Sequence, residues 1–175
     1  MHFKTSKTTL YVSYLLIAGS LLLLPACKPE DPDEGEETIS RVELAFTEGA
    51  NTSTFAFEDG GAAQEITLSA GKTYVVAIKF LNTTVSPTED ITEEVSNESD
   101  EHLVCFEVGA GVDLGITRTD KDANNLEVGL SSLWVATSVS SGTVIVTLRH
   151  QPGVKNGTCT VGDTDVEVTF PVKIQ

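Results

Sequence analysis

The sequence predicts an all-β domain, a two-sheet antiparallel β-sandwich of the immunoglobulin-like, Greek-key type. Runs of alternating apolar and polar residues recur over residues 39–175, are rich in Val and Thr, and are separated by Gly, Asn, Asp and Ser turns. This period of two is typical of half-buried antiparallel strands. About eight short strands favour a sandwich with one core. No stretch supplies the long helical crossovers that a parallel α/β sheet needs.

The alternation predicts the individual strands in order. The runs cover residues 41–46, 54–58, 66–68, 74–81, 104–108, 144–148 and 166–174. Pro171 interrupts the last run, and because proline cannot donate a hydrogen bond to a ladder, we expect an edge position or a bulge there. One segment departs from the pattern. Ser86-Pro87-Thr88-Glu89 fits a helix capping box, so we expect a short helix over residues 87–96.

The first residues resemble a secretory signal. Lys4 and Lys7 precede an apolar stretch from Leu10 to Leu24, which is somewhat short for a membrane span. The stretch ends in Leu24-Pro25-Ala26-Cys27, which resembles a bacterial lipobox. Such a motif implies that Cys27 is lipidated after removal of residues 1–26, and two or more acyl chains give stable membrane anchoring. A single membrane helix with an ordinary cysteine is the alternative.

An acidic segment, residues 27–38, is expected to be an extended tether between the anchor and the domain at 39–175. Its KPEDPDEGEE run has nothing to bury and should repel itself. It also resembles the acidic signal that sends some lipoproteins to the surface of Gram-negative bacteria, which favours the cell surface over the periplasmic face of the outer membrane. The chain has 11 Lys and Arg against 26 Asp and Glu. This charge argues against nucleic acid as a partner.

Two groups of residues are candidate metal ligands. Asp120, Asp122 and Asn124 alternate as the first ligands of a calcium loop do, but Asn125 stands where such a loop requires glycine. A metal-free hairpin turn is the favoured interpretation, because Asp and Asn favour tight turns between strands. His102 and His150 are the alternative ligands, for a transition metal or the iron of haem. Solvated histidines at strand ends are the other interpretation, and we expect no obligatory cofactor.

Three further residues have open alternatives. Once Cys27 is lipidated, Cys105 and Cys159 remain, an even number in an oxidising compartment. They form either a disulfide, worth about 4 kcal/mol by the loop-entropy argument, or two separate thiols. Trp134 is the only tryptophan. It is either a sugar-stacking platform or a core residue among apolar neighbours.

Three stretches together resemble a family of small acidic Gram-negative lipoproteins often labelled "type 1 periplasmic binding fold superfamily". They are residues 87–102, the turn at 120–124 with the following Val128-Gly129-Leu130, and residues 141–152 leading to 164–174. With the opening at Ile39, the resemblance spans nearly the whole domain. It implies an envelope lipoprotein, and it implies no activity or partner.

These observations predict a non-enzymatic binding or accessory module, lipid-anchored at the outer membrane. No GxSxG or HExxH motif is present. The alternative function is a carrier of a cation, haem or a glycan that works with an outer-membrane uptake system. The sequence leaves a protein or glycan partner unidentified.

Overall fold

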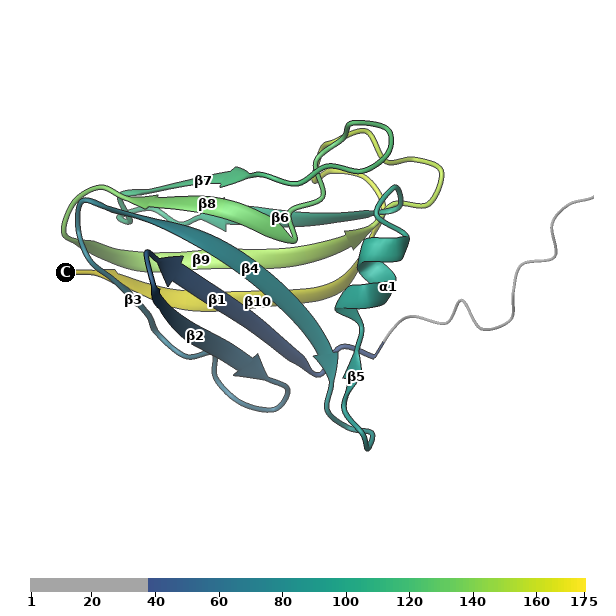
Figure 1. The fold of residues 1–175 in the computed structure, drawn as a ribbon, viewed down its shortest axis with the longest axis horizontal. Helices are drawn as coiled ribbons and strands as arrows, with labels where there is room; N and C mark the ends of the chain where they lie inside the picture. Colours follow the sequence, from purple (N-terminus) through teal and green to yellow (C-terminus); the bar gives the residue numbers. More distant parts are fainter. Residues whose placement is uncertain (1–37) are drawn as a thin grey trace, which may run out of the picture. The chain divides into compact units, whose positions relative to one another are not determined.

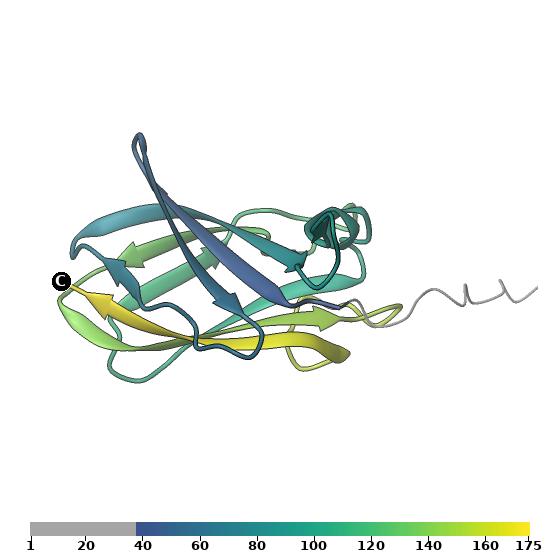
Figure 2. The same ribbon diagram turned by 90° about the horizontal axis from the view of Figure 1, so that it is seen from below.

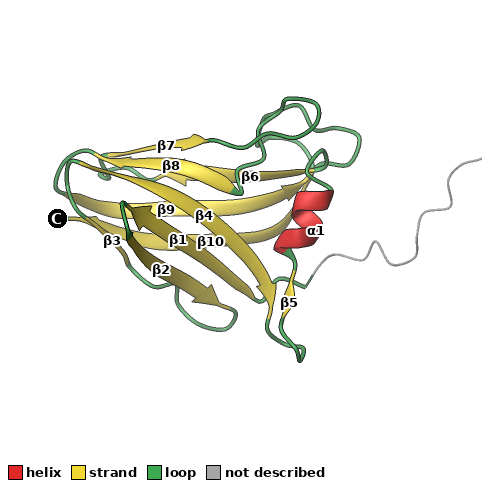
Figure 3. Ribbon diagram, viewed as in Figure 1, coloured by secondary structure: helices red, strands yellow, loops and turns green. Residues whose placement is uncertain are grey.

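The computed structural model describes residues 38–175. The signal segment, Cys27 and nearly all of the tether lie outside the described residues. Within the described part, the chain folds into ten strands and one short helix (Figures 1 and 3). The strands in order are β1 (Arg41–Glu48), β2 (Asn51–Glu58), β3 (Ile66–Leu68), β4 (Lys72–Asn82), β5 (Glu89–Asp90), β6 (His102–Val108), β7 (Leu114–Arg118), β8 (Ser131–Ala136), β9 (Ser140–His150) and β10 (Asp163–Ile174).

The strands form two sheets, so the predicted all-β sandwich is confirmed. One sheet has the order β2-β1-β4-β8-β7, with β5 beside β4, and we call it sheet A. The other, sheet B, has the order β3-β10-β9-β6. Every pairing is antiparallel except that of β3 with β10. Figure 2 shows the sheets as two layers, with β1, β2 and β4 in one and β9 and β10 in the other.

The core lies between the two layers and is built by the alternation seen in the sequence. Inward side chains of β1, β4, β9 and β10 are almost wholly buried, and Trp134 on β8 is 0% exposed at their centre. The Trp134 ring meets Phe46 edge-on at a centroid distance of 5.0 Å and Phe106 at 5.7 Å. Aromatic pairs favour this edge-to-face arrangement.

The helix differs from its prediction over residues 87–96. It is α1, Thr92–Asn97, and Ile91 stands at its N-cap position, so the capping box at Ser86 is wrong. Residues 89 and 90 instead pair with β4 as strand β5. Asp90 then accepts a hydrogen bond from the Thr92 backbone N–H at 3.1 Å, which satisfies one donor at the start of the helix. Ile91 and Val95, four residues apart, are both buried and attach this segment to the core.

Strands β7 and β8 were not predicted from the sequence, and the bulge in β10 does not lie where it was expected. The register of β10 shifts between Thr164 and Val166, not at Pro171. Pro171 lies on β10 just before Val172, the first residue that pairs with β3. Along β10 up to this proline, only β9 pairs with the strand. In the described part of the chain, no helix has the length and apolarity needed to cross a membrane.

Candidate functional site

Most of the predicted site residues gather at one end of the sandwich, which we call the loop end. It consists of the turn at 98–101, the loop at 119–130 and the loop at 151–162, and the last two lie side by side near α1 in Figure 1. The backbone N–H of Gln151 donates to Glu101 O at 2.6 Å. Lys155 Nζ donates to Ser99 O, also at 2.6 Å. These bonds hold the third loop to the first.

The loop at 119–130 uses both of its predicted aspartates as structural acceptors. Asp120 accepts hydrogen bonds from the backbone N–H groups of Gly129 and Leu130, one on each carboxylate oxygen. Asp122 Oδ1 accepts from the N–H groups of Asn124 and Leu126, each at 2.9 Å. These bonds match the metal-free turn. The structure describes no group of three or more His, Cys, Asp or Glu side chains placed to hold a metal.

Asp122 also forms a buried ion pair that sequence reasoning missed. Its Oδ2 lies 2.8 Å from Lys155 Nζ, and the two side chains are 0% and 3% exposed. Burial opposes ionisation of Asp122, but the hydrogen bond and charge of Lys155, with two backbone N–H groups, outweigh it and lower the pKa of this carboxyl. The pair binds the second loop to the third. No local signal could reveal it, since 33 residues separate the partners.

His102 and His150 are brought into direct contact by the pairing of β6 with β9. Their rings stack at a centroid distance of 4.7 Å and an interplanar angle of 5°. A metal ion lies in the plane of each imidazole that binds it, about 2 Å from the nitrogen. Parallel rings at this separation direct their nitrogens along parallel lines, so the pair does not converge on one ion in this arrangement.

The two histidines differ in their surroundings. His102 is buried, and its Nδ1 donates to Glu98 O at 3.1 Å, while its Nε2 lies 3.9 Å from Asp165 Oδ2. Burial lowers the pKa of His102. The neighbouring His150 acts in the same direction, and the hydrogen bond to Glu98 O with the charges of Asp165 and Glu101 opposes both. His150 is half-buried beside Glu101, 3.8 Å from Nε2 to Oε2.

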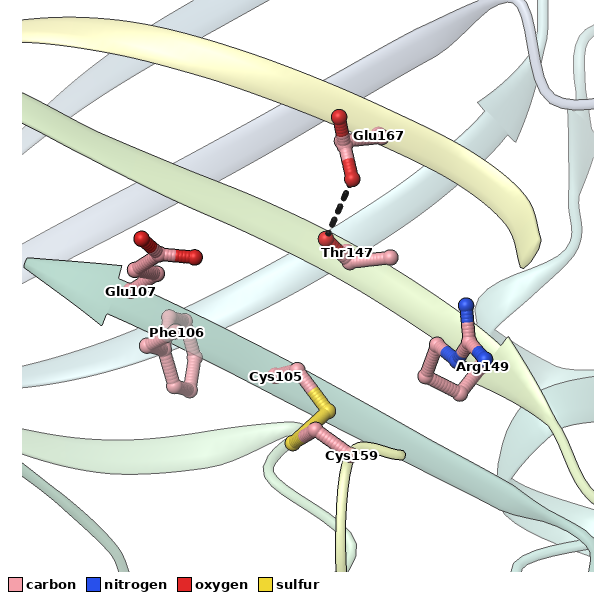
Figure 4. Close-up of a pocket in the computed structure, with 7 residues that line it drawn as sticks. All are labelled: Cys105, Phe106, Glu107, Thr147, Arg149, Cys159 and Glu167. Atoms are coloured by element: carbon pink, nitrogen blue, oxygen red, sulfur yellow. Dashed lines mark hydrogen bonds between the residues drawn. A yellow bond between two sulfur atoms is a disulfide. The ribbon is translucent and has the colours of Figure 1, made fainter. Parts of the chain in front are cut away.

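Cys105 and Cys159 form a disulfide, which settles the alternative left open by the sequence. Cys105 lies on the outer face of sheet B and Cys159 in the third loop, so the bond clamps this loop over β6. Figure 4 shows the disulfide in the wall of a small hollow with Phe106, Glu107, Thr147, Arg149 and Glu167. The hollow measures about 200 Å³. Ligand sites are usually about 300–1,000 Å³, so this hollow is small for an organic ligand.

A larger groove lies between α1 and the outer face of β4, and it was not predicted. Its volume is about 420 Å³, within the usual range of ligand sites. Ala77, Ile78 and Leu130 give it an apolar floor, and the Lys79–Asp90 ion pair lies on its rim. The other lining residues come from α1: Thr92, Glu93, Ser96 and Asn97. The groove joins three separate segments, so only the tertiary structure reveals it.

Trp134 is a core residue, and the sugar-platform interpretation is wrong because its ring is 0% exposed. Its indole Nε1 donates to Ser132 Oγ at 2.9 Å. No family model matches this chain, and neither the curated proteins nor the solved structures give a match.

Proposed function

We propose that this chain is a lipoprotein of the cell envelope, anchored through Cys27, whose β-sandwich is a non-enzymatic binding or accessory module. The observation that carries the proposal is the order of signals along the chain. A leader is followed by Leu24-Pro25-Ala26-Cys27, then by an acidic segment, and then by one compact sandwich that begins at β1. The resemblance to small acidic Gram-negative lipoproteins favours the outer membrane, and the acidic segment favours its outer surface.

The length of the segment after Cys27 suits a tether. Residues 28–40 separate the cysteine from β1 and can span at most about 45 Å when extended. Such a reach would hold the domain clear of lipid headgroups. Six acids in the segment repel one another and the anionic membrane surface, which favours extension.

A non-enzymatic role is supported by the use that the loop end makes of its charged side chains. Asp120, Asp122 and Lys155 hold the loops together. Arg149 donates to the carbonyls of Val161 and Gly162. A general acid or base must be within reach of a substrate proton, and these groups are engaged in internal bonds instead.

The groove beside α1 is the best candidate for the binding site of such a module. It combines an apolar floor with a rim of carboxylate, ammonium, hydroxyl and amide groups, which is the usual composition of a site for a small ligand or a peptide side chain. Loops and helix ends placed by a rigid scaffold are where binding residues usually lie.

The anchor is tested by expressing the full chain in a Gram-negative host with a radiolabelled fatty acid. We expect label in the intact chain and its recovery with membranes, and loss of both in Cys27→Ala. The Cys105→Ala/Cys159→Ala double variant is the matched control and should keep the label. Label that persists in Cys27→Ala, or no label in the wild type, would refute the anchor.

The membrane face is tested separately by adding protease to intact cells. Surface exposure predicts digestion of the anchored chain without permeabilisation, and a domain facing the periplasm would be protected. Replacing the acids of residues 30–37 by Asn and Gln should then reduce surface exposure without loss of fatty-acid label. Unchanged digestion of this variant on intact cells would show that the acidic segment is not an export signal.

The binding role is tested by thermal shift with a peptide library, oligosaccharides, Ca²⁺, Zn²⁺ and haem. A ligand at 100 times its Kd stabilises the domain by about 2.7 kcal/mol. A shift that is lost in Leu130→Glu assigns the groove. The carrier alternative is the second hypothesis from the sequence, and it would need the stacked rings of His102 and His150 to separate before both could bind one ion. It predicts a shift with Zn²⁺ or haem that His150→Gln abolishes.

A further inference from the structure

The outer face of sheet A carries a patch without charge, which we call the neutral face. Twelve residues make it up, in three cross-strand rows, of which the middle one runs from β2 to β7. They are Ala45, Thr47, Thr52, Thr54, Thr73, Val75, Ala77, Gly115, Thr117, Ser131, Leu133 and Val135. In a chain with 26 acidic residues, a patch of this size without a carboxylate is a distinctive surface.

The neutral face is exposed, and its centre is apolar. Val75 is 54% exposed and Val135 is 40% exposed. They lie on neighbouring strands, and Val75 pairs with Leu133, two residues before Val135. Charges border it at both ends: Arg41, Glu43 and Lys79, with Asp90 and Glu93 of the groove, lie at one end. The Lys72–Glu48 ion pair and Asp113 lie at the other. The outer face of sheet B differs, because Glu107, Arg149, Glu167 and Lys173 are distributed along it.

We propose that the neutral face is an interface between two copies of this chain. Two strongly acidic molecules repel one another, so they associate only where contact brings no carboxylates together, and this face meets that condition. A twofold axis places the same patch on both sides of the contact. Sheet faces rich in Val and Thr then pack against each other, as the two layers of a sandwich do. This inference does not depend on the anchor, and the face shares Ala77 with the groove.

The composition of the face argues against other occupants. It has no aromatic side chain on which a sugar ring could stack, because Trp134 points into the core. It also has no lysine or arginine to attract an anionic membrane or a nucleic acid. A second copy offers the matching surface, which is uncharged and of the same width.

The size of the face sets the strength of the association. A stable interface uses about 20–30 residues a side and buries about 800 Å² on each partner. Twelve residues supply about half of this, so the dimer belongs to the weak, reversible class. Repulsion between the acidic surfaces outside the contact weakens the dimer further at low salt. At physiological ionic strength, salt screens this repulsion between charges more than about 8 Å apart.

The test is sedimentation equilibrium of residues 28–175, which contain both sheets and the whole core. We expect the mean mass to rise toward that of a dimer between about 10 μM and about 1 mM, the range of weak complexes. We also expect more dimer at about 0.5 M than at about 0.05 M NaCl, since salt screens the repulsion. A contact built on salt bridges would show the opposite salt dependence.

Two variants with equal added charge complete the test. Val75→Glu/Val135→Glu places two carboxylates at the centre of the neutral face and should hold the protein monomeric over the whole range. Thr67→Glu/Thr169→Glu places two on the outer face of sheet B and should associate as the wild type does. A wild type that stays monomeric at about 1 mM and high salt, or loss of association in both variants, overturns the proposal.

Discussion

The loop end and the neutral face are built on opposite principles. The loop end holds three loops together through a disulfide, a buried ion pair and hydrogen bonds from side chains to backbone. The neutral face is a plain strand surface on which few side chains interact, such as Thr47 with Thr52. In this chain, polar side chains fix the architecture of the loops, whereas the outer face of sheet A exposes an uncharged strand surface.

The largest effect is expected from removal of the disulfide. Replacing both Cys105 and Cys159 by Ala should lower the free energy of unfolding by about 4 kcal/mol, because a closed loop of this length restricts the unfolded chain. Urea unfolding followed by the fluorescence of Trp134 measures it, since this sole tryptophan is buried. The wild type in reducing agent is the control and should lose the same amount. A loss below about 1 kcal/mol would contradict the loop-entropy argument.

The next effect sharpens the comparison within the loop end. Lys155→Met leaves Asp122 buried without its cation and should cost about 3 kcal/mol. Lys155→Met/Asp122→Asn removes both charges and should recover part of the loss. The contribution of this carboxylate is present above the pKa of the unfolded chain, because the pKa of Asp122 is lowered, and it is lost as the pH falls through the folded value. Equal losses in the single and double variants would show that packing, not charge, dominates.

A smaller effect concerns acid and the histidine pair. The pKa of His102 is lowered by burial, so below about pH 6.5 the unfolded chain binds a proton that the folded domain disfavours. The free energy of unfolding should therefore fall as the pH drops below this value. His102→Gln should flatten the dependence, and His150→Gln should keep most of it because burial is the main cause. Titration of the two imidazole resonances by NMR gives an independent check. A His102 that titrates above its usual value would refute the assignment.

The fold was largely predictable from the sequence because the period of two is a local property. The inward residues of β1, β4, β9 and β10 are the ones that the alternation predicted. Strands β7 and β8 were missed because their apolar and polar residues do not alternate clearly: on β8 the exposed Val135 is as apolar as the inward Trp134 and Ala136 beside it. The start of α1 was misplaced because residues 89 and 90 pair with β4, a tertiary contact that overrides a local capping pattern.

The candidate site was less predictable, for a physical reason. The Cys105–Cys159 bond was one of two alternatives because pairing of cysteines depends on the fold. The contact between His102 and His150 depends on the register of β6 against β9, and the Lys155–Asp122 pair on two loops that meet only in three dimensions. The neutral face, in contrast, is formed by alternate residues of five strands, and it can be identified once the register of those strands is known.

The smallest effect tests whether burial alone separates the two regions. Lys79 and Asp90, at the edge of the neutral face, form the same kind of pair as Lys155 and Asp122, with 3.2 Å between Nζ and Oδ2. Their side chains, however, are 57% and 34% exposed. Water screens such a pair, so Lys79→Met should change the free energy of unfolding by less than about 1 kcal/mol. The same urea unfolding measures it beside Lys155→Met, which deletes the same ammonium group. If the two variants lose equal stability, burial does not decide the strength of these ion pairs. The contrast between the loop end and the neutral face is then wrong as well.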